Sequence, residues 1–409
     1  MVTLTIDQKH IQVAEGTTIL EAAEQNGIPI PRLCYLKEIN EIGACRICCV
    51  EVEGKEKLIT SCNNLVEDGM VIYTNSPKVR MNRRNMIELI LSQHDCRCAS
   101  CVKSGNCSLQ KIANDLNVID TPFYLDIERI PWNQNFPLIR DSAKCIKCMR
   151  CIQICDKVQS LNVWDVESTG SRTTVHVSKN RKIEEADCSL CGQCITHCPT
   201  GALRERDDTA KAWRAIDNPK KITVVQVAPA VRTAWGETLG LDRQEATMGK
   251  ITDALKRLGF DYVFDTSFSA DLTIMEEAHE FIERVKNGGT LPMITSCSPG
   301  WIKYCEHYFP DMTDNLSTCK SPQQMFGAIA KSYYAEKMGL KPEDIVSVSV
   351  MPCTAKKFEI GRDNQDANGC PDVDYSMTTR ELARMIKKYG IRFNELPDEE
   401  FDAPLGLGT

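Results

Sequence analysis

The chain has 409 residues, enough for two to four domains of roughly 100–200 residues each, and its 42% hydrophobic and 26% charged residues are typical of a globular protein. The net charge of −7 argues against binding to nucleic acid or to a membrane surface. The 22 cysteines are the unusual feature. Because the N-terminus has no secretory pattern and no apolar run reaches about 18 residues, we expect metal clusters in a reducing cytoplasm, in an anaerobe.

The first expected domain covers residues 1–78. Alternating apolar residues predict a hairpin of residues 2–6 and 10–13, and Thr17 or Thr18 is expected to cap a helix ending near Asn26. A strand, VEVEG, and four cysteines at C-x10-C-x2-C-x13-C spacing follow: Cys34, Cys45, Cys48 and Cys62. This pattern resembles the β-grasp [2Fe–2S] ferredoxin domain, in the form fused into respiratory and hydrogenase subunits. The resemblance implies that these four thiolates hold one [2Fe–2S] cluster.

Residues 79–120 form the second expected domain, which begins with a helix over residues 80–93. One histidine and three cysteines follow at H-x3-C-x2-C-x5-C spacing: His94, Cys98, Cys101 and Cys107. The spacing resembles a one-histidine, three-cysteine [4Fe–4S] site of the same subunits. An imidazole in place of a thiolate removes a negative charge, which should raise the reduction potential. The alternative for His94 is a solvated histidine at a helix end. Cys49 and Cys96 fall outside these patterns.

Residues 119–140 are expected to form an extended linker, and residues 138–208 the third domain. Its two cysteine runs, at 145–155 and 188–198, are separated by a strand-rich insert at 163–177. The runs resemble bacterial two-cluster ferredoxins, in which the fourth cysteine of each run binds the other cluster. Two [4Fe–4S] sites are therefore implied: Cys145, Cys148, Cys151 and Cys198 in one, and Cys188, Cys191, Cys194 and Cys155 in the other. The alternative is a pair of structural zinc sites.

Strands and helices alternate over residues 220–409, which predicts a mostly parallel sheet in a fourth, α/β domain. We expect strands at 221–229, 261–266, 291–297 and 344–353, and helices at 247–259, 274–289 and 378–390. Cys297 and Cys353 should then follow strand ends, where open α/β sheets place their ligands. The predicted fold class is a multidomain α+β chain that ends in an incomplete α/β domain.

Two segments of this last domain, TSCSPGW (295–301) and MPCTAKKFE (351–359), resemble the first two signatures of iron-only, [FeFe], hydrogenases. The resemblance implies a place for the H-cluster, a [4Fe–4S] cubane bridged to a di-iron centre. Cys297 takes the proton-donor place and Cys353 a ligand place. Cys353 belongs to the second signature. The ligand place of the first signature holds Ser298, and no C-x3-C signature follows before Thr409. Since a serine hydroxyl is a poor ligand for a cubane iron, we expect the H-cluster to be absent.

The proton route of the hydrogenase family is better preserved. Glu277, Glu280, Arg284 and Ser317 occupy matching places, and Lys356 matches a residue that contacts cyanide in the family. The alternative for the two glutamates and the arginine is a solvated helix face. No G-x-G-x-x-G fingerprint or phosphate loop is evident, so we expect the chain to bind neither NAD(P) nor flavin.

Three functional interpretations follow. In the first, the four clusters are the wiring of a flavin-based electron-bifurcating NAD(P)H/ferredoxin oxidoreductase, and the hydrogenase site is degenerate. The resemblance then implies a flavin- and NAD(P)-binding iron–sulfur partner subunit, a small thioredoxin-like [2Fe–2S] partner and ferredoxin. In the second, which the ending DAPLGLGT favours, the chain is a fragment of an active NAD(P)-linked or bifurcating hydrogenase. In the third, it is a structural scaffold without redox activity.

Overall fold

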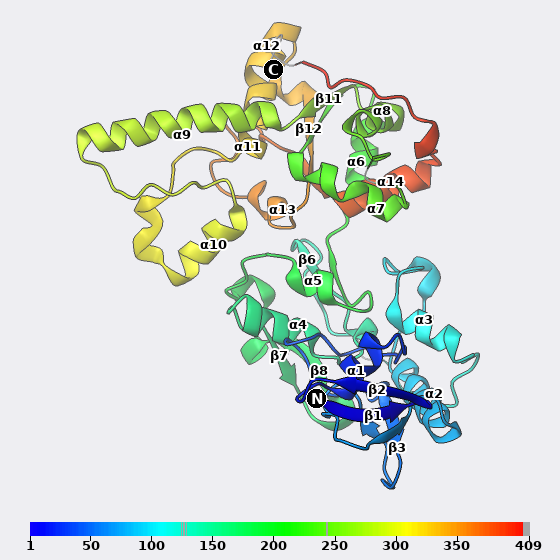
Figure 1. The fold of residues 1–409 in the computed structure, drawn as a ribbon. Helices are drawn as coiled ribbons and strands as arrows, with labels where there is room; N and C mark the ends of the chain where they lie inside the picture. The colour runs from blue at the N-terminus through cyan, green and yellow to red at the C-terminus, as the bar shows by residue number, and fades with distance from the viewer. Residues whose placement is uncertain (124, 126, 128, 243, 404–409) are drawn as a thin grey trace. The chain divides into compact units, whose positions relative to one another are not determined.

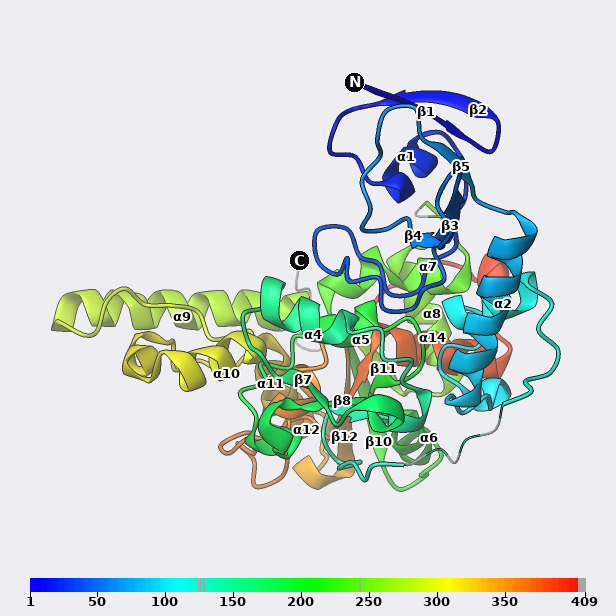
Figure 2. The ribbon, with the colours of Figure 1, turned by 90° about the horizontal axis from the view of Figure 1, so that it is seen from below.

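The computed structural model describes residues 1–123, 125, 127, 129–242 and 244–403. Positions 124, 126 and 128 of the expected linker, residue 243 and the 404–409 end of the expected fourth domain lie outside that part. The chain divides into two compact units (Figures 1 and 2). The first unit comprises Met1–Gln134, Ile139–Ala186 and Gln193–Arg204, and the second comprises Asn135–Leu138, Asp187–Gly192 and Glu205–Thr409.

A five-stranded mixed sheet forms the N-terminal part of the first unit, in the order β2-β1-β5-β3-β4. Its strands are β1 (Val2–Ile6), β2 (Lys9–Val13), β3 (Cys49–Val52), β4 (Ile59–Thr60) and β5 (Val71–Tyr73). The predicted hairpin is confirmed: Asp7 and Gln8 have positive φ, as a two-residue turn between twisted strands requires. The predicted helix is confirmed as α1 (Ile19–Gln25), which Thr18 caps together with Glu21 in a capping box. The short β4 and β5 were not predicted.

Two helices continue the first unit. They are α2 (Pro77–Ser92), capped by Ser76, and α3 (Ser108–Asp115). Their apolar residues Ile87, Leu109 and Ile112 pack in one cluster with Leu33 and Ile47 of the preceding cysteine-bearing loops. The helix predicted over 80–93 is therefore confirmed, and this packing anchors the loops that carry the predicted ligands.

The ferredoxin-like segment consists of short elements around two cysteine runs. They are β6 (Leu138–Arg140), α4 (Arg150–Gln153), β7 (Trp164–Glu167), β8 (Thr174–Val177), α5 (Gln193–His197) and β9 (Leu203–Glu205). Strands β7 and β8 pair antiparallel, which confirms the strand-rich insert, and β6 pairs with β9. Helix α4 runs directly into a π-helical turn that ends at Val158.

The second unit is built on a parallel sheet in the order β11-β10-β12-β13. Its strands are β10 (Ile222–Val227), β11 (Tyr262–Asp265), β12 (Ile345–Met351) and β13 (Tyr375–Thr378). The apolar residues of α6 (Thr209–Ile216), α7 (Trp235–Leu239), α8 (Met248–Leu258) and α14 (Thr379–Tyr389) share a core with this sheet. A second cluster joins it to α11 (Pro322–Ile329) and α12 (Ala335–Met338). The predicted parallel sheet is confirmed.

The strand predicted over residues 291–297 is wrong. Only Ile294 pairs, in an isolated bridge with Leu316 of a loop. Pro292 has no backbone N–H to offer a ladder, and the neighbouring backbone is a loop rather than a strand of the sheet. Cys297 consequently lies just before α10 (Pro299–Tyr308) and not at a strand end, whereas Cys353 follows β12 as predicted.

Helix α9 (Ser267–Asn287) starts earlier than the predicted helix at 274. The side chains of Ser269 and Thr273 donate to the carbonyls of Thr266 and Ser269, so these polar residues are accommodated inside the first turns. Figure 1 shows α9 extending away from the sheet. Among the described residues, no helix is both long and apolar enough to span a bilayer.

Candidate functional site

The four cysteines predicted to hold a [2Fe–2S] cluster are all buried in the first unit. Their side chains hydrogen-bond in two pairs, Cys34 with Cys45 and Cys48 with Cys62. Within each pair the hydrogen bond lowers the pKa of one thiol, at Cys45 and Cys48, and raises that of its partner. The backbone N–H of Cys45 also donates to the sulfur of Cys34 at 3.5 Å. Paired, desolvated sulfurs suit a two-iron cluster with two thiolates on each iron.

A buried arginine supports this site and was not predicted. Arg83 of α2 is 5% exposed, and its guanidinium donates to the carbonyls of Ile47 and Cys49 at 3.0 and 3.2 Å. These two carbonyls flank Cys48, where the loop that carries Cys45 and Cys48 runs into β3. The guanidinium of Arg83 therefore anchors the end of this loop and pairs two carbonyl acceptors that burial would otherwise leave without a donor.

His94 lies in the first unit and is 9% exposed, which contradicts the alternative of a solvated histidine. Burial lowers its pKa, which favours the neutral imidazole, the form that binds metals. Its Nδ1 is buried without a hydrogen-bond partner among the described residues, while a hydrogen bond joins the ring to the backbone of Lys144. One free nitrogen and one bonded to the backbone is the usual state of a metal-ligating histidine. The chemistry of His94 therefore fits a cluster ligand.

The predicted set of Cys145, Cys148, Cys151 and Cys198 is brought together. All four line one cavity of the first unit. The backbone N–H groups of Lys147 and Arg150 donate to Cys145 and Cys148, in turns where Lys147 and Met149 adopt left-handed conformations with φ of 55° and 62°. Such strained non-glycine residues concentrate at functional sites, where surrounding structure holds them. Here they aim N–H groups at the sulfurs, and the donor set fits a [4Fe–4S] cluster.

The second ferredoxin set is divided between the two units. Cys188 and Cys191 belong to the second unit, and Cys194 and Cys155 to the first. Within the units, the N–H of Leu190 donates to the sulfur of Cys188 and the N–H of Val163 to the sulfur of Cys155, both at 3.4 Å. Ligation by these four residues stays a prediction.

In the part of the chain that the structure describes, no three histidine, cysteine or carboxylate side chains are arranged to hold a single metal ion. A cubane cluster has a different requirement, because each of its four ligands binds a different iron and the ligands stand farther apart.

The hydrogenase-like residues gather in the second unit around the start of α10. Lys356 of α13 (Lys356–Glu359) donates to the carbonyl of Cys297 at 2.8 Å and pairs with Glu359 at 3.1 Å. Ser298 is the N-cap of α10, where its hydroxyl accepts from the N–H of Trp301 at 3.5 Å. The side chain in the family's ligand place thus has a structural role of its own.

The residues matching the proton route form a polar network and not a solvated helix face. Glu280 accepts from Ser317 at 2.8 Å and from Arg284 at 2.6 Å, and its side chain and that of Arg284 are only 16% and 14% exposed. Burial alone would raise the pKa of Glu280, but these hydrogen bonds lower it overall. Glu277 accepts from Thr295, two residues before Cys297, at 2.6 Å.

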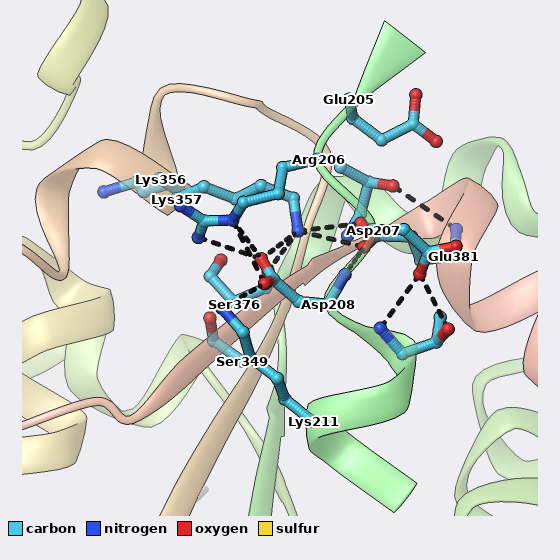
Figure 3. A network of polar contacts seen from close by, with 12 residues as sticks. Glu205, Arg206, Asp207, Asp208, Lys211, Ser349, Lys356, Lys357, Ser376 and Glu381 are labelled. Atoms are coloured by element: carbon cyan, nitrogen blue, oxygen red, sulfur yellow. Dashed lines mark hydrogen bonds and ion pairs between the residues drawn. The ribbon is translucent and has the colours of Figure 1, made fainter. Parts of the chain in front are cut away.

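A buried ionic network lies next to Lys356 and was not predicted (Figure 3). Lys357 is fully buried and contacts Asp208 at 2.8 Å and Glu381 at 2.9 Å, which are also buried. Figure 3 shows Lys356 and Lys357 extending in opposite directions. Burial raises the pKa of Glu381; Asp208 is lowered to a pKa of about 2, because Lys357 and its other cationic partners outweigh the effect of burial. The network thus fixes α13, from which Lys356 reaches Cys297.

Comparison with known families gives one match in each of the four domains expected from the sequence. Four family models match: "2Fe-2S iron-sulfur cluster binding domain" at residues 1–77, "NADH-ubiquinone oxidoreductase-G iron-sulfur binding region" at 83–122, "4Fe-4S dicluster domain" at 144–202 and "Iron only hydrogenase large subunit, C-terminal domain" at 221–409. The chain therefore carries [2Fe–2S] and [4Fe–4S] binding domains ahead of a hydrogenase-type domain.

Three relatives illustrate the similarity. The NADP-reducing hydrogenase subunit HndD of Solidesulfovibrio fructosivorans is 48% identical, over 100% of this chain and 72% of that protein. Iron hydrogenase 1 of Clostridium pasteurianum is 39% identical, over 99% of this chain and 71% of that protein. The NADPH-Fe(3+) oxidoreductase subunit alpha of Geobacter sulfurreducens is 38% identical, over 50% of this chain and 24% of that protein. The chain belongs to the [FeFe]-hydrogenase large-subunit family.

Proposed function

We propose that this chain is the iron–sulfur electron-transfer subunit of a multi-subunit, flavin-based electron-bifurcating NAD(P)H/ferredoxin oxidoreductase, with a degenerate hydrogenase site. The observation that carries the proposal is the contact between three predicted ligand sets of the first unit. One [2Fe–2S] and three [4Fe–4S] clusters, when bound, would each carry one electron at a time.

The [2Fe–2S] set and the central ferredoxin set are joined by two polar side chains. The amide of Asn40, which is fully buried, donates to the carbonyl of Cys34 at 2.6 Å and to that of Cys148 at 2.9 Å. Arg150 donates to the carbonyls of Cys34 and Tyr35 at 3.3 and 3.0 Å. Ligand-bearing loops from two predicted sites therefore share direct hydrogen bonds, which supports electron exchange between them.

The central set also abuts the one-histidine, three-cysteine set. The sulfur of Cys107 lies 3.7 Å from the carbonyl of Pro199, the residue after Cys198. A Cβ added at Gly201 would come within 2.7 Å of the sulfur of Cys101, so only glycine permits this approach. The set containing Cys145 and Cys198 thus lies between the other two, an arrangement that favours a wiring role.

The use of Ser298 as a helix cap favours the degenerate interpretation of the hydrogenase site. Its hydroxyl is engaged with the backbone of α10. We propose as partners a flavin- and NAD(P)-binding iron–sulfur subunit, a small thioredoxin-like [2Fe–2S] subunit and ferredoxin, and as location the cytoplasm. HndD, which matches the whole of this chain over 72% of its own length, is a subunit of an NADP-reducing hydrogenase.

A second candidate is the catalytic subunit of an active NAD(P)-linked or bifurcating [FeFe] hydrogenase. The observation that favours it is the intact network of Glu280, Arg284 and Ser317, with Glu277 close to the Cys297 segment. Such a network could hold and pass protons.

Infrared spectroscopy on the complex purified anaerobically from its native host separates the two candidates. Iron-bound CO and cyanide absorb where protein does not. We expect iron–sulfur electron paramagnetic resonance (EPR) signals without those bands. Bands that belong to this polypeptide would overturn the degenerate interpretation and establish the hydrogenase. If the purified complex contains neither iron nor labile sulfide, the remaining interpretation is a structural scaffold without redox activity.

A further inference from the structure

The cavity that holds Cys145, Cys148, Cys151 and Cys198 has an uneven charge distribution. Two arginines, Arg140 and Arg150, line it together with the cysteines. No carboxylate is among the described residues of its lining, which is otherwise apolar apart from Thr200. A group bound there would meet two cations and no side-chain anion other than the four thiolates.

The two arginines differ in how fully they are bonded. Arg150 directs its guanidinium at the backbone of the [2Fe–2S] loop, at the carbonyls of Cys34 and Tyr35. Arg140 is 4% exposed, and its Nη2 donates to the hydroxyl of Thr174 at 2.8 Å. Its Nη1 is buried and has no hydrogen-bond partner among the residues that the structure describes.

An unpaired donor on a buried cation is costly. A buried charged group without its hydrogen bonds costs more than the roughly 1–3 kcal/mol of a neutral one. Arginine cannot avoid this cost by losing its proton under ordinary conditions. Burial lowers the pKa of Arg140, and the charges that oppose this effect are, largest first, those of Cys145, Cys151, Glu167 and Asp141. The missing acceptor for Nη1 is therefore expected on the cavity side.

We propose that Arg140 donates its free Nη1–H to a sulfur atom of the [4Fe–4S] cluster bound by Cys145, Cys148, Cys151 and Cys198. The positive charge of Arg140 then raises the reduction potential of this cluster. Hydrogen bonds to cluster sulfurs and net charge are two of the levers that set such potentials. One added electron increases the negative charge in the cavity, so a fixed cation stabilises the reduced form more than the oxidised form.

This inference rests on the proposed function and deepens it. The cavity lies between the [2Fe–2S] set and the set of His94 and its cysteines. A raised potential at the middle position favours electron transfer to this cluster from either neighbour. Arg140 is then a positioning and tuning residue for electron transfer in the first unit.

The test is an anaerobic redox titration with dithionite of the full chain loaded with its clusters, followed by EPR. The variant is Arg140→Gln, and the control is Arg172→Gln, which removes the same charge from an exposed side chain of the same segment. We expect Arg140→Gln to lower the reduction equilibrium constant of one [4Fe–4S] cluster at least tenfold, which is 59 mV for a one-electron couple. The other clusters and the control should be unchanged.

Unaltered potentials for every cluster, with unaltered iron content, would overturn the inference and leave the proposed function standing. Wild-type protein that binds no [4Fe–4S] cluster would overturn the proposed function instead. If Arg140→Gln loses the cluster, Arg140→Lys decides, because it keeps the positive charge of the side chain but removes the guanidinium Nη1–H. A shift confined to the same cluster supports the inference, and no shift overturns it.

Discussion

Replacing Lys357 with methionine should strongly destabilise the second unit. The substitution keeps the volume of the side chain but removes a cation that lies 2.8 Å from Asp208 and 2.9 Å from Glu381, with all three residues buried. Asp208 keeps Arg206 and Lys211 as partners. Among the described residues, Glu381 keeps only the backbone N–H donors of Asp208 and Thr378. Leaving a buried charge uncompensated costs about 3–5 kcal/mol.

The measurement is thermal unfolding followed by circular dichroism under anaerobic conditions. A loss of this size corresponds to roughly 6–20 °C, at roughly 2–4 °C per kcal/mol for a domain of 150–250 residues. The matched control is Lys211→Met, which removes a second lysine from the same carboxylate. Lys211 is 40% exposed, so its loss should cost about 1 kcal/mol or less.

The pH dependence gives a second check on the reasoning. Burial already raises the pKa of Glu381 with Lys357 present, and removing the cation raises it further. A carboxyl with a raised pKa in the folded state binds more protons folded than unfolded, so stability falls as pH rises above the unfolded pKa. Lys357→Met should therefore be less destabilised at pH 5 than at pH 8.

Two outcomes would refute this account. One is a Lys357→Met protein that unfolds at the same temperature as Lys211→Met. The other concerns the double variant Lys357→Met, Glu381→Gln, which removes the stranded charge and should recover part of the lost stability. If it recovers nothing, the cost of Lys357→Met does not come from an uncompensated carboxylate.

Three further predictions concern the cluster sites and the degenerate site. His94→Cys should retain a [4Fe–4S] cluster with a lower reduction potential, and an unchanged redox titration would remove His94 from the ligands. Asn40→Ala should lower the free energy of unfolding by about 2 kcal/mol, because the carbonyls of Cys34 and Cys148 lose their donor. The control is Asn75→Ala, at an exposed position, and equal denaturant midpoints for the two variants would contradict the role of Asn40 as a bridge between the two loops. Ser298→Ala should cost about 1 kcal/mol through the lost cap of α10. A melting temperature equal to that of the wild type would show that the cap does not contribute.

Local sequence determined much of this protein. Cysteine spacing is a local property, since a C-x-x-C turn presents two sulfurs to one cluster wherever it lies in a fold. The spacing therefore pointed to three cluster-binding segments, each of which a family model also matches. Alternating apolar residues and capping residues likewise predicted the N-terminal hairpin, α1 and the parallel sheet of the second unit.

Long-range packing decided the residues that surround the clusters. Arg83, Arg140 and Arg150 resemble surface arginines in sequence. Only the tertiary structure buries Arg83 and Arg140 and brings all three against cysteine-bearing loops. Asn40 is 108 residues from Cys148, a separation that no local pattern registers.

Context also decided one error and one open alternative in the second unit. The apolar run at 291–297 had the composition of a strand, but a strand requires a neighbour, and none of the sheet's strands lies beside it. For Glu280 and Arg284 the sequence left a solvated helix face open as the alternative, and the contacts of Glu280 with Ser317 and Arg284 exclude it. Periodicity shows which residues prefer burial or pairing, but the partner that satisfies them comes from elsewhere in the chain, and only the folded structure supplies it.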